Sequence, residues 1–237
     1  MKAQKLSIII PSLNEAAHIR RTLSALQTLR KNGHEIILSD GGSTDDTISL
    51  AESKVDICIN SPRGRAAQMN AGAQYARGDI LCFLHADTLP PQNIDAIIIQ
   101  ALNQSSKQWG RFDVRLTGKQ FSFRIIERLM NLRSCISNIA TGDQGIFVYR
   151  DIFNRLSGFA EIPLMEDIEL SKRLRKISRA LCIHKKPLIT SSRRWEENGI
   201  TSTVLLMWQL RLRYFLGTPE SVLARAYNPE KNRDSKK

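Results

Sequence analysis

The sequence predicts an α/β protein whose central sheet is mostly parallel and flanked by helices. One observation is the apolar run Ile80–Leu84, which lies between Gly78-Asp79 and two prolines. Such a run is typical of a strand that is buried on both faces of a parallel sheet. The other is the order of elements before it, because three strand–helix units indicate parallel strands joined by right-handed crossovers. The carboxyl ends of these strands then share one sheet edge, where open α/β sheets bind ligands.

Apolar spacing and turn residues predict the individual elements. Pro11 ends the first strand, and Ser12 and Glu15 have the spacing of a capping box that opens the first helix. Ser43 and Asp46 repeat this spacing before the second helix. The expected strands cover 6–10, 35–39, 57–59, 80–84, 109–116, 145–149 and 180–183. The expected helices run from Ser12 to about 31, from Thr47, and over 65–77, 94–102, 121–139, 152–156, 166–177 and 201–216, with 191–198 as a polar loop.

Composition limits the class of protein. The net charge of +12 over 237 residues favours an anionic partner such as a nucleotide, a nucleic acid or an acidic membrane, or else a solvated surface. The four cysteines form no C-x-x-C pair, which indicates a reducing compartment and argues against a zinc site. No signal peptide precedes the first strand, and the late apolar run Val204–Trp208 is shorter than the roughly 20 residues that cross a bilayer. A cytoplasmic protein is expected.

Two motifs in the first half could contact a nucleotide. Asp40 and the glycines after it lack the G-x-G-x-x-G spacing of a dinucleotide site, so they form either a simple turn or a turn whose carboxylate accepts hydrogen bonds from a base or a ribose. Arg63 and Arg65 flank Gly64 at a helix start, where they either bind phosphate or lie on the surface.

Three further motifs could carry chemistry. Asp87, at the end of the central strand, is suited to a hard cation such as Mg²⁺ or Mn²⁺, with His85 as a neighbour, or it only caps the loop. Asp167, beside Glu166, is either a general base or part of an acidic first turn that complements the helix dipole. Arg193-Arg194-Trp195 could clamp a diphosphate and stack on a sugar, or form a surface ion-pair cluster.

Taken together and in this order, the motifs resemble those of family 2 glycosyltransferases, over about residues 6–200. The matching stretches are Pro11–Glu15, Asp40 to Thr47, Asp79 to Asp87, Thr141–Gly145 and Glu166-Asp167. The chain is most similar to the compact subgroup associated with radical-SAM and selenodomain proteins. The resemblance implies a GT-A fold and an inverting, metal-dependent and non-processive enzyme that moves a sugar from a nucleotide sugar, UDP-linked by expectation, to a hydroxyl acceptor.

The resemblance also implies roles for single residues. The donor nucleotide would be bound by Pro11, Asn14, Glu15, Asp40, Arg65, Asp87 and Arg194, and Asp87 would ligate Mg²⁺ or Mn²⁺. Asp143, Gln144 and Trp195 would lie in the acceptor region, and Asp167 with Glu166 would be catalytic. Two positions depart from the family's pattern: His85 stands where the first acid of its D-x-D motif is found, and Ser191 stands where the Gln of its Q-x-x-R-W motif is found.

The resemblance and the chain pattern lead to one expected domain over 1–227. Residues 1–90 form its nucleotide-binding half, 91–200 its acceptor half and 201–216 a C-terminal amphipathic helix, and 228–237 is expected to be a disordered basic tail. The apolar residues of the last helix could pack on the core, or could bind a membrane surface at the inner face and bring a lipid-linked acceptor close.

Other functional classes stay open at this point. A nucleotidyltransferase on a related fold would release pyrophosphate, although the chain lacks a Gly-rich loop with a catalytic Lys after its first strand. A nucleotide-sugar-binding protein would not turn over its donor. A nucleic-acid-binding module would require a contiguous basic face, and no specific nucleic acid is expected.

Overall fold

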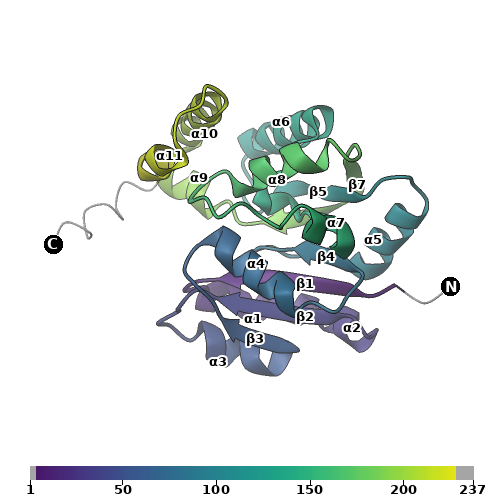
Figure 1. The fold of residues 1–237 in the computed structure, drawn as a ribbon. Helices are drawn as coiled ribbons and strands as arrows, with labels where there is room; N and C mark the ends of the chain where they lie inside the picture. The colour runs from purple at the N-terminus through teal and green to yellow at the C-terminus, as the bar shows by residue number, and fades with distance from the viewer. Residues whose placement is uncertain (1–3, 228–237) are drawn as a thin grey trace.

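The fold centres on a seven-stranded sheet with the order β3-β2-β1-β4-β6-β5-β7, seen in a computed structural model that describes residues 4–227 (Figure 1). The strands are β1 (Leu6–Ser12), β2 (Glu35–Asp40), β3 (Ile57–Asn60), β4 (Ile80–Phe83), β5 (Trp109–Leu116), β6 (Phe147–Tyr149) and β7 (Leu181–Thr190). The first four are mutually parallel, β6 is antiparallel to both β4 and β5, and β7 is parallel to β5. The predicted mostly parallel sheet is therefore confirmed, while the expected tail at 228–237 lies outside the described residues.

Helices cover both faces of the sheet. They are α1 (Ala16–Ala25), α2 (Gln27–Lys31), α3 (Thr47–Ala51), α4 (Arg65–Tyr75), α5 (Ile94–Asn103), α6 (Phe121–Ser137), α7 (Arg150–Arg155), α8 (Glu166–Leu174), α9 (Arg193–Asn198), α10 (Ile200–Phe215) and α11 (Glu220–Tyr227). Short 3-10 turns, η1 (Glu52–Lys54) and η2 (Gly142–Gln144), complete the elements.

The alternation of side chains along β1 divides the core into two layers. Ile8 and Ile10 point to the face that α1, α2, α3 and α5 cover, and Ile9 points to the face that α4, α7 and α8 cover. All three isoleucines are fully buried. This double burial explains the continuous apolar run Ile8–Ile10 within β1, and the run Ile80–Phe83 of the neighbouring strand β4 is buried in the same way.

A third group of helices lies beyond the β5–β7 side of the sheet. Helices α6 and α10 lie side by side there (Figure 1), because Phe123 and Ile126 of α6 share a cluster with Ile200 and Val204 of α10. A further cluster joins α8, α10 and α11 around Leu210 and Leu223. These helices hold the second half of the chain against the sheet.

Several local predictions are wrong for identifiable reasons. Ser12 belongs to β1 and its hydroxyl donates to Asp40, so it forms no capping box, and Glu15 is the N-cap of α1 without a side-chain cap bond. The first helix breaks at Leu26 into α1 and α2. Asp46 is the N-cap of α3 but makes no cap bond either. The expected polar loop at 191–198 contains helix α9, and α11 was not predicted.

Helix α10 packs on the core in part, and its binding to a membrane surface stays a prediction. Val204 and Met207 pack inward, whereas Leu205, Trp208, Leu212 and Phe215 are exposed, with Trp208 at 71%. Within the described residues, no helix combines the length and the apolar character that crossing a bilayer requires.

Candidate functional site

The site lies at the sheet edge where β1, β2 and β4 end. Because these strands are parallel, the segments after Ser12, Asp40 and Phe83 leave the sheet together. Strand β6 runs the other way, so the loop that precedes it, with η2, arrives at the same edge. The predicted convergence of distant motifs at one edge is thereby confirmed for the backbone.

Asp40 holds the turn after β2. Its buried carboxylate accepts hydrogen bonds from the Ser12 hydroxyl (2.9 Å), from the Gly42 amide (2.9 Å), and from the amide and hydroxyl of Ser43 (2.6 and 2.5 Å). Four donors nearly fill the capacity of a carboxylate. In this structure the carboxylate therefore fixes the shape of the loop.

Asn14 ties the loops after β1 and β2 together. Its side-chain oxygen accepts a hydrogen bond from the Thr44 backbone amide at 2.8 Å, and its backbone amide donates to the Ser43 hydroxyl at 2.8 Å. It has a left-handed backbone (φ 55°), which Asn tolerates better than most residues. Pro11 precedes this region as a half-buried residue of β1. The two loops thus form one rigid rim beside the strand ends.

Glu15 and Asp87 form an acidic pair on this rim. Burial and then the charge of Asp87 raise the pKa of Glu15, while Arg193, His18 and Arg65 act in the opposite direction. One Glu15 oxygen, Oε2, is buried without a hydrogen-bond partner in the described chain. Asp87 accepts a single long bond from the described residues, from the Thr88 hydroxyl at 3.5 Å. Two adjacent and incompletely satisfied carboxylates suit a hard divalent cation.

His85 meets the second half of the chain at Gly142. A Cβ on Gly142 would lie 2.7 Å from His85 Nε2 and 3.7 Å from Arg65 Nη1, so only glycine allows this close approach. His85 Nε2 is buried without a partner among the described residues. Burial, followed by the charge of Arg65, lowers the pKa of His85 well below its usual range. The imidazole is therefore neutral at neutral pH and is available as a ligand or an acceptor.

Glu166 and Asp167 open helix α8 next to this contact. The Gly142 amide donates to Asp167 Oδ2 at 2.7 Å, and the Ile168 amide donates to Oδ1 at 2.7 Å. Glu166 is buried, and its Oε1 lies 3.8 Å from Arg65 Nη1. The helix start thus orients both carboxylates toward the sheet edge and pairs one of them with a cation.

Burial perturbs both acids. It raises the pKa of Glu166 to about 7, with the neighbouring charge of Asp167 as the next cause. Burial also raises the pKa of Asp167, although the amides of Gly142 and Ile168 act against it. Acids whose pKa values lie closer to neutrality are suited to accept and release protons at physiological pH.

The remaining predicted residues divide into two groups. Gln144 is fully buried and forms a capping box with Thr141, so it shapes the η2 turn, whereas Asp143 Oδ1 is buried without a partner in the described part of the chain. Arg194 donates to the Tyr227 carbonyl at 3.1 Å and lies over its ring. Trp195 packs in the cluster around Phe123 rather than beside the acidic pair.

The sequence motifs did not show how two arginines of this region are placed. Arg193 belongs to the Arg-Arg-Trp motif, and in helix α9 its Nη1 lies 3.3 Å from His18 Nε2 and its charge acts on Glu15 of the acidic pair. Arg133 of α6 has two buried nitrogens without described partners, and burial together with Arg211 lowers its pKa to about 10. Its helical spacing from Ile126 and Met130 could have placed it on the buried face.

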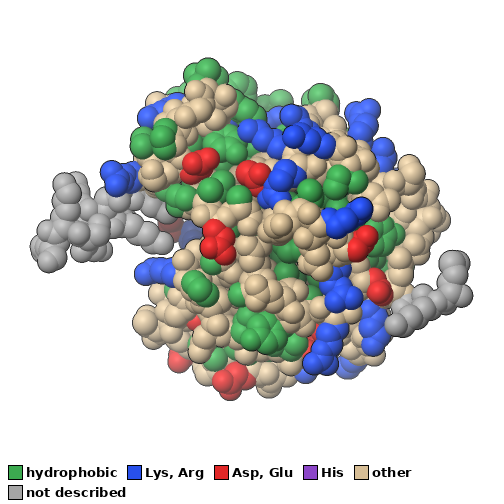
Figure 2. All heavy atoms as spheres, in the orientation of Figure 1, with side chains coloured by type: hydrophobic (Ala, Val, Ile, Leu, Met, Phe, Trp, Pro, Cys, Tyr) green, Lys and Arg blue, Asp and Glu red, His purple; other side chains and the backbone are tan. Residues whose placement is uncertain are grey.

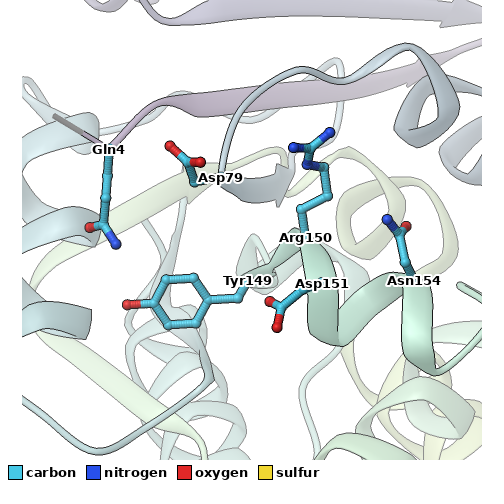
Figure 3. Close-up of a pocket in the computed structure, with 6 residues that line it drawn as sticks. All are labelled: Gln4, Asp79, Tyr149, Arg150, Asp151 and Asn154. Carbon is cyan, nitrogen blue, oxygen red and sulfur yellow. The ribbon is translucent and has the colours of Figure 1, made fainter. Parts of the chain in front are cut away.

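A second depression lies at the opposite edge of the sheet. It measures about 540 Å³ and is lined by Gln4, Asp79, Tyr149, Arg150, Asp151 and Asn154 (Figure 3). Its charged groups are engaged in structural bonds: Asp79 accepts from the Lys5 amide at 2.8 Å, and Arg150 donates to the Ala76 carbonyl at 3.2 Å. This depression is therefore a weaker candidate for the active site than the sheet edge where β1, β2 and β4 end.

The surface charge is mixed on the face that Figure 2 shows. Lys and Arg side chains alternate there with acidic and hydrophobic ones and form no continuous stripe. A nucleic-acid groove requires a continuous basic path. This face gives no support to the nucleic-acid-binding alternative.

Comparisons with known proteins agree with this architecture. A sequence profile of glycosyl transferase family 2 matches residues 7–154. The probable glycosyltransferase YdaM of Bacillus subtilis is 25% identical over 247 residues, covering 92% of this chain and 56% of that protein. Glycosyltransferase AglE of Haloferax volcanii is 37% identical over 95 residues, covering 36% of this chain and 31% of that protein. The chain thus spans about half the length of the first relative and about a third of the second.

Solved structures give the same result for the fold. TarS of S. aureus, in complex with UDP, has a TM-score of 0.65 at 14% identity, covering 79% of this chain and 60% of that one. Glucosyl-3-phosphoglycerate synthase of Mycobacterium tuberculosis, in complex with Mn²⁺, UDP and glucosyl-3-phosphoglycerate, has a TM-score of 0.63 at 18% identity, covering 92% and 82%. These likenesses confirm the expected GT-A fold.

Proposed function

Because this chain belongs to glycosyl transferase family 2, we propose that it transfers a sugar from a nucleoside-diphosphate sugar to a hydroxyl group with inversion at the anomeric carbon. One observation carries the proposal: the Glu15–Asp87 pair and the Asp167 carboxylate lie at the same sheet edge. Gly142 connects them, because it approaches His85 closely and donates its amide to Asp167. Glu15 and Asp87 are suited to bind the donor diphosphate through a cation, and Asp167 is suited to act on the acceptor.

The donor end is assigned to the first half of the chain. Pro11, Asn14 and Asp40 form or brace the rim on which the nucleoside would rest. Asp87, assisted by Glu15, would hold Mg²⁺ or Mn²⁺, and their unsatisfied oxygens fit such an ion. The bound ion would stabilise negative charge on the departing diphosphate. The similar structures bound to UDP, or to Mn²⁺ and UDP, support a UDP-sugar and a divalent ion.

Positive side chains around the pair would add to this stabilisation. Arg65 is half-exposed at the start of α4 and lies between the donor end and Glu166. Arg193 acts on Glu15 from α9, so we assign it a share of the diphosphate contact for which the family resemblance had selected Arg194. Arg194 and Trp195 would then support the rim through Tyr227 and the Phe123 cluster.

Asp167 is proposed as the general base. Its two amide bonds fix the carboxylate, and each oxygen retains a further acceptor position. It would take the proton of the acceptor hydroxyl on the side of the sugar opposite the diphosphate, which is the geometry of inversion. Glu166, paired with Arg65, would balance charge beside it. Asp143, with its unpartnered oxygen, would line the acceptor region, and Gln144 would hold that turn in shape.

The acceptor is proposed to be carried by a membrane lipid. Helices α6 and α10 each bear a line of exposed apolar side chains at helical spacing. These are Phe121, Ile125, Leu129, Leu132 and Ile136 on α6, and Leu205, Trp208, Leu212, Phe215 and Leu216 along α10 and just after it. Exposed apolar surface on this scale marks an interaction surface, and helices with basic residues suit an anionic bilayer.

The same two helices connect the apolar lines to the catalytic acids. The charge of Arg211 on α10 lowers the pKa of Arg133 on α6, and the charges of Asp143 and Asp167 raise it. Arg211 also lowers the pKa of Asp167. Two arginines without a dedicated acidic partner in the described chain suit an anionic group of the acceptor, such as a lipid phosphate. A lipid held against α6 and α10 would therefore present its head group beside the proposed base.

The deciding experiment compares the full chain with Asp167→Asn, using UDP-sugars and Mn²⁺. We expect wild-type protein to release UDP, and Asp167→Asn to lose about 100-fold to 10,000-fold in rate while it binds UDP with Mn²⁺ unchanged by calorimetry. Asp87→Ala should lose the Mn²⁺-dependent part of UDP binding. Asp151→Asn, an exposed acid in the first turn of α7, is the matched control and should behave as wild type.

Three results would contradict the proposal. Release of pyrophosphate would identify a nucleotidyltransferase. Binding of UDP-sugars without any turnover, with every donor and a lipid extract present, would identify a binding protein. Near wild-type rates for Asp167→Asn would remove Asp167 as the base.

A further inference from the structure

Two thiols and an imidazole lie together away from the strand ends that form the candidate site. Cys135 comes from α6, and Cys182 and His184 come from β7. One ligand atom from each lies within 4.8 Å of the others, and no other group of this kind occurs in the residues that the structure describes. Cys135 and Cys182 are partly buried, while the His184 side chain is 60% exposed. The cluster is therefore accessible from solvent and is built by two separate elements.

The fold explains why these residues meet. Cys182 and His184 are two apart on a strand and so share one face of β7. Arg111 of β5 lies opposite Cys182 in the register of the two strands. It donates to the Asn131 carbonyl at 2.7 Å and so holds α6 over this face. Cys135 follows Asn131 by four residues, which places it on the same side of α6.

We propose that Cys135, Cys182 and His184 form a Zn²⁺-binding site, with the fourth tetrahedral position taken by water. Two thiolates and an imidazole are preferred ligands of this borderline-soft ion, and a three-residue set with one open position is a known zinc arrangement. Hard cations such as Mg²⁺ prefer oxygen ligands, so this site and the Asp87 site would select different metals.

The residues around the cluster favour this assignment. Asp113 Oδ2 lies 3.0 Å from His184 Nδ1, the kind of carboxylate contact that fixes the ring of a metal-binding histidine. Asp113 also pairs with Arg111, so these two charges balance each other. Two thiolates would neutralise the charge of Zn²⁺. The zinc ion and its ligands would therefore have no net charge, which suits their partly buried position.

The protonation of the thiols adds an expected property. Burial, followed by the hydrogen bond with Cys135, raises the pKa of Cys182 to about 12, although the charge of Arg111 acts in the opposite direction. Without a metal the Cys182 thiol is protonated at neutral pH. Zn²⁺ must displace that proton, so its affinity is expected to fall as the pH is lowered.

The proposed site runs against the expectation from the sequence that the cysteines form no zinc site. That expectation depended on the absence of a C-x-x-C pair. The ligands here are spread over residues 135–184, and their proximity depends on the packing of α6 on β5 and the pairing of β5 with β7. A metal would join α6 to the edge strand, and α6 leads directly into the η2 turn of the candidate active site.

Cobalt(II) is a suitable spectroscopic probe for the test. The full chain is kept reduced with a phosphine, stripped with a chelator and titrated with Co²⁺. We expect one equivalent to produce a thiolate-to-cobalt charge-transfer band together with the visible bands of four-coordinate Co²⁺, and Zn²⁺ to displace it. Cys182→Ser and Cys135→Ser should weaken binding by at least about tenfold and lower the intensity of the charge-transfer band to about half or less per bound Co²⁺, because each variant keeps one thiolate. Asp113→Asn should weaken binding while it retains the band.

Matched variants keep the result interpretable. Cys58→Ser removes an exposed thiol outside the cluster, and Asp87→Ala removes the proposed Mn²⁺ ligand, so both should retain the band. His184→Gln changes an exposed side chain and should fold normally if a Cys variant does not. Wild-type protein without a thiolate band, or with unchanged band intensity and Co²⁺ affinity in both Cys182→Ser and His184→Gln, would overturn the proposal. Neither result depends on whether UDP-sugar turnover is found.

Discussion

Asp40 shows how a residue of a binding loop can act through its neighbours. Its carboxylate accepts four hydrogen bonds within the loop between β2 and α3 and from the end of β1. Asn14 is also bonded to this loop, by hydrogen bonds with Thr44 and Ser43. The residue Asp40 therefore fixes the rim of the candidate site, on which the nucleoside is proposed to rest.

The Asp40→Asn variant tests this role. An amide nitrogen cannot accept from the amides of Gly42 and Ser43, so we expect a loss of about 2 kcal/mol or more in the free energy of unfolding, measured with urea. The control is Asp46→Asn, since Asp46 is exposed and makes no cap bond, and its loss should stay within about 0.5 kcal/mol. Equal losses in the two variants would contradict the structural role of Asp40.

At this scale the sequence located the residues but not their partners. The motifs placed Asp87, Asp167 and Asp40 at strand or helix ends, and the structure places them there. The sequence interpretation placed Arg193 and Arg194 in a polar loop as a diphosphate clamp, and the family motif selected Arg194. In the short helix α9 it is Arg193 that acts on Glu15. The direction of a side chain depends on a helix of six residues, and so short a polar helix has no clear periodicity.

Helices α6 and α10 are unusual elements because each is apolar on two faces. Phe123 and Ile126 of α6 are buried, yet Ile125 and Leu129 of the same helix are exposed. In α10, Leu210 is buried and Trp208 is exposed. Apolar spacing in the sequence predicted both helices with nearly correct bounds, but it could not tell which apolar face the core would cover.

The outward faces of these helices predict binding to lipid. The full chain should co-sediment with vesicles that contain anionic lipid, and the double substitution Leu129→Ser with Trp208→Ser should reduce the bound fraction strongly, because both residues would enter the interfacial layer. The control, Tyr75→Ser with Ile177→Ser, also removes two exposed apolar side chains but lies outside both helices. If the two double variants sediment equally, the proposed membrane face is wrong.

For the molecule as a whole, the reversed strand β6 brings the loop of η2 to the candidate active site. It lies between β4 and β5 and is antiparallel to both. Its entry loop therefore reaches the edge where β4 ends, and Gly142 meets His85 there. The parallel half of the sheet was predictable from its regular alternation of strands and helices. The pairing of β6 with β4 and β5, and of β7 with β5, was not predictable, because it joins segments that are far apart in the sequence and shows no periodic signal.

Burial of acids at that junction makes the stability of the whole fold depend on pH. Glu166 has its pKa raised to about 7, so between pH 4.5 and 7 the native state retains a proton that the unfolded chain releases. The free energy of unfolding therefore decreases as the pH rises through this window. Glu166→Gln should raise Tm relative to wild type by an amount that grows from about pH 4.5 to about 7 and is constant above it.

Differential scanning fluorimetry from acidic to neutral pH can follow this difference. Glu161→Gln is the comparison, because this exposed carboxyl lies in the loop before α8 and its substitution should change Tm only slightly. A Tm difference for Glu166→Gln that shrinks as the pH rises would show that the buried carboxyl is stabilised as the anion instead.

Helix α11 gives practical guidance for anyone who produces this protein. Tyr227 accepts a hydrogen bond from Arg194, lies under its guanidinium, and acts on the charge of Arg65. An expression boundary placed before this tyrosine would remove the residue to which Arg194 is bonded. An affinity tag that is removed by proteolysis is accordingly safer before β1, at the far side of the fold (Figure 1), than next to α11.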